Sequence, residues 1–239
     1  ITLTKALEQS VNTAAVRISE AVGRDVVRKV ASDFGIQSDL AAGPALALGA
    51  SESTLLEMTG AYAGILNGGS SVRPYGLVDL RLRDDEVPLL GQDGGIGERV
   101  ISENSAQYLT YMMYKVVEDG TGARARLQGR QAAGKTGTTS AARDAWFIGF
   151  TADYVVGVWM GYDDNTPLSG VTGGGLPAEI WHEVMVRVHE GLPARPLPML
   201  IPEPRLPPIS QSQHPATPQP SNDLAERILQ EVLGILGGN

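Results

Sequence analysis

The chain has 239 residues, a formal net charge of −8 and 42% hydrophobic residues, enough for one large domain or two small ones with a core. The acidic balance and only four lysines argue against a nucleic-acid-binding protein, which would carry a clustered basic face. Cysteine is absent, which excludes disulfides and thiolate metal sites, and no apolar run reaches the roughly 18 residues of a membrane span.

The first part of the chain is predicted to be helical. Apolar residues recur at helical spacing over 4–22, 25–34 and 51–67, and a glycine follows each segment as a plausible stop. Ser51 or Ser53 is the expected N-cap of the third helix.

A mixed region comes next. Over residues 76–82 the apolar side chains of Val78, Leu80 and Leu82 alternate with those of Leu77, Asp79 and Arg81, which predicts a half-buried strand. A glycine-rich loop is expected over 92–97. Ser102 is expected to cap a helix over 103–118.

Three strands are predicted over 132–139, 145–150 and 154–161. Short turns join them, so we expect antiparallel neighbours. Pro177 is suited to the first turn of a following helix, over 178–189. Helices first, then hairpin strands and a returning helix, indicate an α+β fold with an antiparallel sheet flanked by helices.

Composition changes at Gly191. Ten of the fifteen prolines lie between Pro193 and Pro220, so we predict one domain over 1–191 and a Pro-rich linker over 192–220. The remaining 221–239 fits an amphipathic helix, which would pack on its own domain, self-associate or bind a specific partner.

One segment matches two incompatible motifs. From Gly129 it reads Gly-x-x-x-x-Gly-Lys-Thr, the phosphate-binding P-loop; from Lys135 it reads Lys-Thr-Gly-Thr, the strand with which active-site-serine acyl transferases hold a substrate carboxylate. A P-loop needs a buried strand before its first glycine and a helix starting at Lys-Thr. Neither is predicted, so the strand interpretation is favoured.

An acyl-transferase site needs an anchor for the substrate carboxylate and donors for the oxyanion. Thr136 and Thr138 alternate along the strand and so share one face, while Lys135 supplies positive charge. Gly137 lacks the Cβ that would obstruct a ligand, and the Thr138 N–H is a candidate oxyanion donor.

A Ser-x-Asn element is expected beside this strand. Ser10-Val11-Asn12 and Ser102-Glu103-Asn104 both fit, but helix capping accounts fully for Ser102. Ser10 and Asn12 are expected within a helix, where their side chains compete with the backbone unless they have another task. A third element, Ser-x-x-Lys, is absent, because no serine stands three residues before any of the four lysines.

Together these motifs resemble the transpeptidase domain of bifunctional (class A) penicillin-binding proteins, over about four-fifths of the chain. The segments that carry the resemblance are 1–15, 48–52, 61–63, 118–122, 133–139, 144–150, 157–163 and 178–181. It implies the penicillin-binding protein/serine β-lactamase-like fold, incomplete here. It also implies an enzyme that cross-links peptidoglycan stem peptides ending in D-Ala-D-Ala, is acylated by β-lactams and uses no cofactor or metal.

When the family's functional residues are matched to this sequence, the resemblance implies that Ser10 relays a proton and that Asn12 forms a hydrogen bond with the substrate. Lys135, Thr136, Gly137, Thr138 and Thr139 correspond to the carboxylate-binding strand. The family's nucleophilic serine lies upstream of Ser-x-Asn, so we expect the chain to begin downstream of it and to be inactive by itself.

The family also implies a bacterial protein at the periplasmic face of the inner membrane, held there by an N-terminal anchor. Peptidoglycan stem peptides and β-lactams are the expected ligands, and residues 193–239 are a possible site of self-association or of contact with cell-wall synthesis proteins. The alternative function is a non-catalytic scaffold segment in such a complex, with a P-loop nucleotide hydrolase a distant third.

Overall fold

The computed structural model describes residues 1–83, 85–91 and 95–203. Thr2–Ile201 form one compact unit, and its centre is a three-stranded antiparallel sheet. The strands are β5 (Ala133–Thr138), β6 (Asp144–Phe150) and β7 (Val155–Gly161), in the order β5-β6-β7. The three predicted strands and their antiparallel pairing are confirmed.

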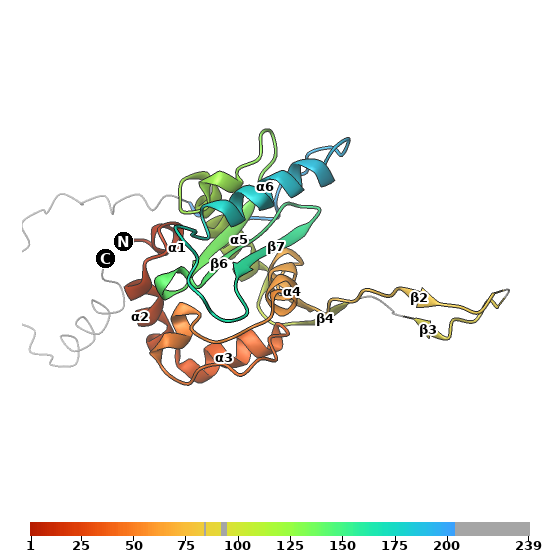
Figure 1. The fold of residues 1–239 in the computed structure, drawn as a ribbon, viewed down its shortest axis with the longest axis horizontal. Helices are drawn as coiled ribbons and strands as arrows, with labels where there is room; N and C mark the ends of the chain where they lie inside the picture. The colour runs from red at the N-terminus through yellow and green to blue at the C-terminus, as the bar shows by residue number, and fades with distance from the viewer. Residues whose placement is uncertain (84, 92–94, 204–239) are drawn as a thin grey trace, which may run out of the picture. The chain divides into compact units, whose positions relative to one another are not determined.

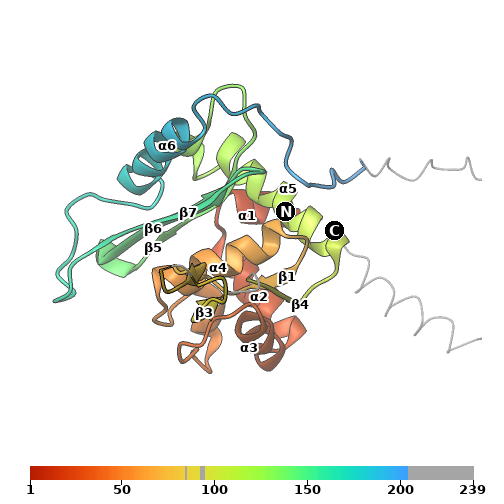
Figure 2. The ribbon, with the colours of Figure 1, turned by 90° about the vertical axis from the view of Figure 1, so that its right-hand side faces the viewer.

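Helices cover both faces of this sheet (Figure 2). Helix α6 (Leu176–Val188) packs on β6 and β7 from one side, with Pro177 in its first turn as predicted. On the other side α5 (Glu103–Glu118) packs on β5 and α4 (Leu55–Leu66) on β7, while α1 (Leu3–Glu8) lies against α5. The α+β class is confirmed.

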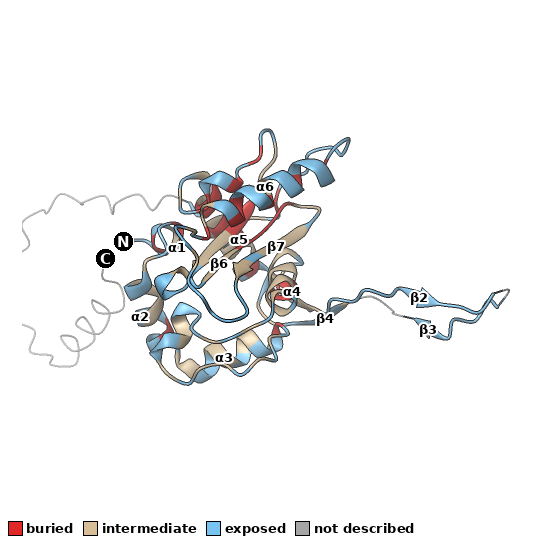
Figure 3. Ribbon diagram, viewed as in Figure 1, coloured by how far each residue is buried: buried red, intermediate tan, exposed pale blue. Residues whose placement is uncertain are grey.

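The core fills both layers between helices and sheet (Figure 3). Phe147 of β6 and Trp181 of α6 are fully buried and meet edge to face with ring centroids 5.3 Å apart. The Trp181 indole donates to the Val156 carbonyl at 3.1 Å, so its polar atom is satisfied inside the core. Phe150, three positions after Phe147, lies on the opposite face and packs in the cluster that contains Met113 of α5.

The helix predicted over 4–22 is two helices, and that prediction was wrong. α1 ends at Glu8 and α2 (Asn12–Val22) begins four residues later. Between them Ser10 adopts a left-handed conformation with φ of 53°, which turns the chain. The spacing of hydrophobic residues does not reveal a single left-handed residue. The apolar positions before and after Ser10 still fit one continuous helix, so the break could not be predicted.

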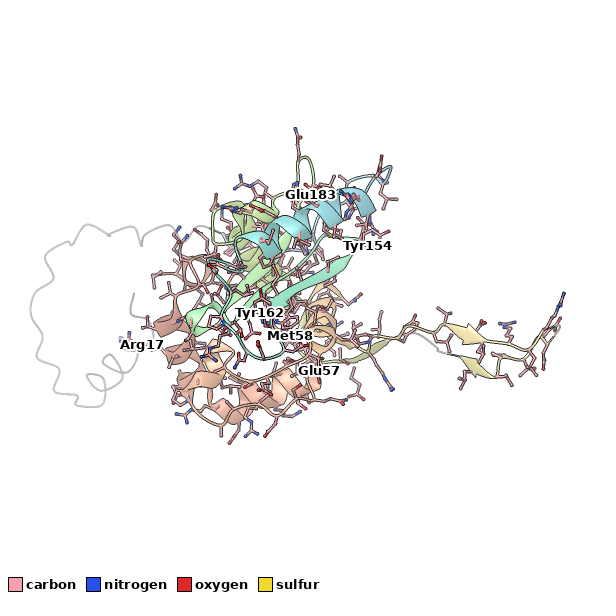
Figure 4. All side chains as sticks on the ribbon, in the orientation of Figure 1. Arg17, Glu57, Met58, Tyr154, Tyr162 and Glu183 are labelled. Atoms are coloured by element: carbon pink, nitrogen blue, oxygen red, sulfur yellow. The ribbon has the colours of Figure 1, made fainter. Side chains whose placement is uncertain are left out.

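The following helices have identifiable ends. α2 stops at Gly23, with φ of 99°, and α3 (Arg24–Asp33) follows it. The N-cap of α4 is Thr54, which forms a capping box with Glu57. Figure 4 marks Glu57 at this end of α4. The prediction of Ser51 or Ser53 as the cap was therefore wrong: the Ser51 hydroxyl accepts a hydrogen bond from the Ala41 N–H instead.

The strand predicted over 76–82 is shorter and more exposed than expected. Only β2 (Asp79–Leu80) is a strand, paired with β3 (Leu90–Gly91) in a hairpin that extends away from the helices (Figure 1). The side chains of Val78 and Leu82 are 66% and 58% exposed, so the expected half-burial is wrong. Alternation predicts which residues share a face of a strand but not whether another element covers it.

Short elements complete the fold. β1 (Ser70–Val72) pairs with β4 (Ile96–Arg99), so the loop predicted over 92–97 overlaps the start of a strand. Single 3-10 turns are η1 (Pro44–Leu48), η2 (Ala123–Ala125) and η3 (Ser140–Ala142).

Ser102 caps α5 as predicted, accepting from the Ser105 N–H. Among the residues that the structure describes, no helix is both long and apolar enough to cross a bilayer.

The packed unit continues past Gly191 to Ile201. Leu197 is buried and its N–H donates to the Gln131 side chain at 2.9 Å, while Arg195 forms an ion pair with Asp153. The first ten residues of the Pro-rich segment therefore make specific contacts with the domain. The helix expected over 221–239 lies outside the described residues.

Candidate active site

Among the residues that the structure describes, β5 pairs only with β6, so the strand that carries Lys-Thr-Gly-Thr has one open edge there. The Thr139 N–H donates to the Asp144 carbonyl at 3.0 Å, and bonded and non-bonded pairs alternate along an antiparallel ladder. With this register the backbone N–H and C=O groups of Thr136 and Thr138 point away from β6. Lys135 lies inside a strand and starts no helix, so the P-loop interpretation is wrong.

A pocket of about 410 Å³ lies beside this edge. Its lining residues are Ser10, Thr121, Thr136, Thr138, Thr172 and Gly174. Five of these six carry a hydroxyl group, so the wall offers several short hydrogen-bond donors. The structure thus brings Thr136 and Thr138 together on one face with Ser10, as the alternation of the strand predicts.

Lys135 passes the open edge of β5 and contacts two residues that line this pocket. Its Nζ donates to Ser10 Oγ at 2.8 Å and to the Thr136 carbonyl at 2.9 Å, and lies 3.5 Å from Thr136 Oγ1. The side chain is half-buried, and this burial lowers the pKa of Lys135 to about 8 because desolvation disfavours the charged form. Near neutral pH the group is therefore a cation that gives up its proton more readily than an ordinary lysine.

Ser10 is held in its position by the turn between α1 and α2. Its N–H donates to the Leu7 carbonyl at 3.0 Å, and the next residue, Val11, donates to Ala6. A left-handed conformation at a residue with a Cβ costs about 1–2 kcal/mol, and such residues concentrate at functional sites. Here the strained turn directs the Ser10 hydroxyl to Lys135.

Thr121 is a pocket residue that motif reasoning did not single out. Its hydroxyl lies 2.8 Å from Thr136 Oγ1, and its N–H donates to the Glu8 carbonyl at 3.2 Å, just before Ser10. The segment 118–122 contributed only to the overall resemblance. A lone threonine in a Gly-Thr-Gly turn carries no chemical signal of its own, and only the fold places it against β5.

The β7–α6 loop, residues 162–175, is a second part of the pocket wall that was not predicted from the sequence. It supplies Thr172 and Gly174. The Gly173 N–H donates to Thr138 Oγ1 at 3.0 Å. A Cβ on Gly173 would lie 2.4 Å from the Gly137 carbonyl oxygen, so only glycine fits this approach to β5.

Four residues expected at the site are not among those that line the pocket: Lys135, which contacts Ser10 and Thr136, and three others. Asn12 is exposed in the first turn of α2. Gly137 lies beneath Gly173, and the Thr139 hydroxyl accepts from the Asp144 N–H at 2.8 Å, which closes the turn between β5 and β6.

Comparison with known proteins shows the family of this chain. Residues 1–186 match the family described as "Penicillin binding protein transpeptidase domain". The chain belongs to the penicillin-binding protein transpeptidase family. The resemblance inferred from the motifs is therefore confirmed.

Similar penicillin-binding proteins come from several bacteria. Penicillin-binding protein 1A of Aquifex aeolicus is 36% identical over 77% of this chain and 25% of its own length. The crystal structure of penicillin-binding protein 1A from Haemophilus influenzae has a TM-score of 0.72 at 28% identity, covering 82% of this chain and 35% of that one.

An acyl-enzyme structure is also similar. Penicillin-binding protein A from Mycobacterium tuberculosis, solved as an imipenem acyl-enzyme complex, has a TM-score of 0.64 at 27% identity, covering 78% of this chain and 47% of that one. The chain spans about a quarter of the length of the curated penicillin-binding proteins that it matches.

Proposed function

We propose that this chain is the C-terminal part of a peptidoglycan D-Ala-D-Ala transpeptidase, and that its pocket binds the terminal carboxylate of a stem peptide or of a β-lactam. One observation carries the proposal: Ser10, Thr136 and Thr138 line a single pocket at an open strand edge, and the Lys135 ammonium donates to the Ser10 hydroxyl. Donors and a positive charge are what a carboxylate requires.

The chemistry assigned to these groups is acyl transfer. A serine oxygen attacks the penultimate D-alanine carbonyl, the C–N bond to the last D-alanine breaks, and the released amine takes up a proton. We assign delivery of that proton to Ser10; the hydrogen bond from Lys135 Nζ, whose pKa is about 8, supports this role. The Thr138 N–H, directed to the open edge, is suited to stabilise the oxyanion.

The attacking serine is assigned to a Ser-x-x-Lys segment that these 239 residues do not contain. We therefore propose that the chain binds the carboxylate but forms no acyl-enzyme by itself. Asn12 and Thr139 keep their proposed roles in substrate binding for the complete domain. By family membership the parent protein is assigned to the periplasmic face of the bacterial inner membrane.

Labelling with a fluorescent penicillin tests the proposal. We expect no covalent band with the 239-residue chain, and a band with the longer product of the same gene if its preceding residues supply Ser-x-x-Lys. In that longer protein Lys135→Ala should abolish labelling. A covalent band on the 239-residue chain contradicts the assignment of the nucleophile, and undiminished labelling of the Lys135→Ala protein contradicts the site.

A further inference from the structure

Thr121 joins three separate segments that each contribute to the pocket. Its N–H donates to the Glu8 carbonyl, two residues before Ser10. Its own carbonyl oxygen lies so close to Gly174 that a Cβ there would be 2.3 Å away. Its hydroxyl lies 2.8 Å from Thr136 Oγ1. The backbone of Thr121 is thus fixed on two sides, and its side chain is directed to β5.

The two hydroxyl groups share one hydrogen bond, so only one of them donates. Thr136 Oγ1 also lies 3.5 Å from Lys135 Nζ, which has protons to give and no lone pair when it is charged. When Thr121 donates to Thr136, the proton of Thr136 remains free for a third partner. When Thr136 donates to Thr121 instead, the pocket loses that donor.

An anion in the pocket selects the first arrangement. A carboxylate accepts hydrogen bonds and gives none, so it requires the Thr136 proton to point into the pocket. A hydroxyl that accepts one hydrogen bond also becomes a stronger donor, because hydrogen bonds in a chain polarise one another.

We propose that Thr121 is a positioning residue for carboxylate recognition: by donating to Thr136 Oγ1 it directs the Thr136 proton at the substrate carboxylate. This inference rests on the proposed function of the pocket and adds a residue to it. Thr121 acts through Thr136, and its contribution is specific to an anionic ligand because a neutral one gains less from a polarised donor.

The experiment compares two ligands on the 239-residue chain by isothermal titration calorimetry or NMR titration. The first is diacetyl-L-Lys-D-Ala-D-Ala, and the second is the same peptide with a C-terminal amide. Thr121→Val keeps the shape of the side chain and removes the hydroxyl, whereas Thr121→Ser keeps the hydroxyl. Thr13→Val, at an exposed position of α2, is the matched control.

We expect Thr121→Val to weaken binding of the carboxylate peptide about three- to tenfold, the effect of one hydrogen bond, and that of the amide less than about twofold. Thr121→Ser should restore carboxylate affinity to within about twofold, and Thr13→Val should match wild type.

Unchanged carboxylate binding in Thr121→Val, or an equal loss for both peptides, overturns the role of Thr121 and leaves the proposed function standing. Equal affinity of the wild-type chain for both peptides instead overturns the carboxylate site itself, and the role of Thr121 with it.

Discussion

Lys135 Nζ donates a hydrogen bond to Ser10 Oγ over 2.8 Å, although the two residues lie 125 positions apart in the chain. The contact exists because β5 has an open edge around which the lysine side chain can pass. It also requires the left-handed turn at Ser10, which interrupts what would otherwise be a continuous helix.

The charge of Lys135 predicts a pH limit for carboxylate binding. With a pKa of about 8 in the free chain, the group is protonated below this pH and neutral above it. The affinity for diacetyl-L-Lys-D-Ala-D-Ala should therefore be constant below about pH 7 and begin to fall near pH 8. Lys135→Arg stays charged and should show no such fall up to pH 10. A wild-type affinity that is flat from pH 6 to 10 contradicts this prediction.

Gly173→Ala should displace the β7–α6 loop from β5. The new Cβ would meet backbone oxygen atoms of Trp146 and Gly137 at 2.3 and 2.4 Å, and backbone cannot give way as a flexible side chain can. We expect a loss of about 1–3 kcal/mol in the free energy of unfolding, the range for overpacked sites, together with weaker carboxylate binding.

Gly76→Ala is the control for this substitution, because nothing lies within 4 Å of the position that a Cβ on Gly76 would take. Urea denaturation of both variants measures the difference. Equal stability of the two proteins would show that the loop does not approach β5 as closely as described.

Glu57 predicts a defined acid sensitivity. Hydrogen bonds from Ser38, Thr54 and Gln37 hold the pKa of its carboxyl group at about 2, well below the ordinary 4.5. Because the folded-state pKa is lowered, this stabilisation is complete above pH 4.5 and is lost as the pH falls from 4.5 to 2.

Glu57→Gln should thus be less stable than wild type at pH 7. On acidification its free energy of unfolding should fall less steeply than that of wild type; the two slopes should differ by at most about 1.4 kcal/mol per pH unit, the value for one proton. Thermal unfolding from pH 7 to 2.5 tests it, with Glu52→Gln, at an exposed neighbouring position, as the control. If the stability of Glu57→Gln and that of wild type fell in parallel with decreasing pH, the lowered pKa of Glu57 would be refuted.

Asp153 is predicted to be a major contributor to stability. It pairs with Arg130 at 3.0 Å, where the two side chains are only 14% and 8% exposed, and it also holds Arg195. Asp153→Ala leaves the Arg130 charge buried without its partner, which typically costs about 3–5 kcal/mol.

The control is Glu183→Ala on α6, whose side chain points to solvent in Figure 4 and whose ion pair with Arg187 is exposed. There we expect a change below about 1 kcal/mol in urea denaturation. A loss below about 1 kcal/mol for Asp153→Ala would mean that Arg130 finds water or another partner when Asp153 is removed.

Regular elements with strong local signals were predictable from the sequence. The strands over 133–161 have dense β-branched and aromatic residues and short turns, and α5 has a serine cap followed by a sustained helical pattern. These signals act within a few residues, where hydrogen-bonding geometry and side-chain period decide the structure. The shared face of Thr136 and Thr138 follows from the same local rule.

The site itself was predictable only in part. Ser10 and Lys135 were expected to meet because their motifs resemble those of a known family. Thr121 and the β7–α6 loop were not identified, because a threonine between glycines carries no periodic or chemical signal. Conversely, Asn12 and Thr139 belong to the expected motifs but do not line the pocket.

The sequence alone determined the α+β class, the central strands and the family, since these depend on short-range patterns and on motif identity. Only the tertiary structure decided which hydroxyl groups share the pocket, how Lys135 passes the edge of β5 and why Gly173 must lack a side chain. Those properties depend on contacts between segments far apart in the chain, and the packing of the whole domain sets the distances between them.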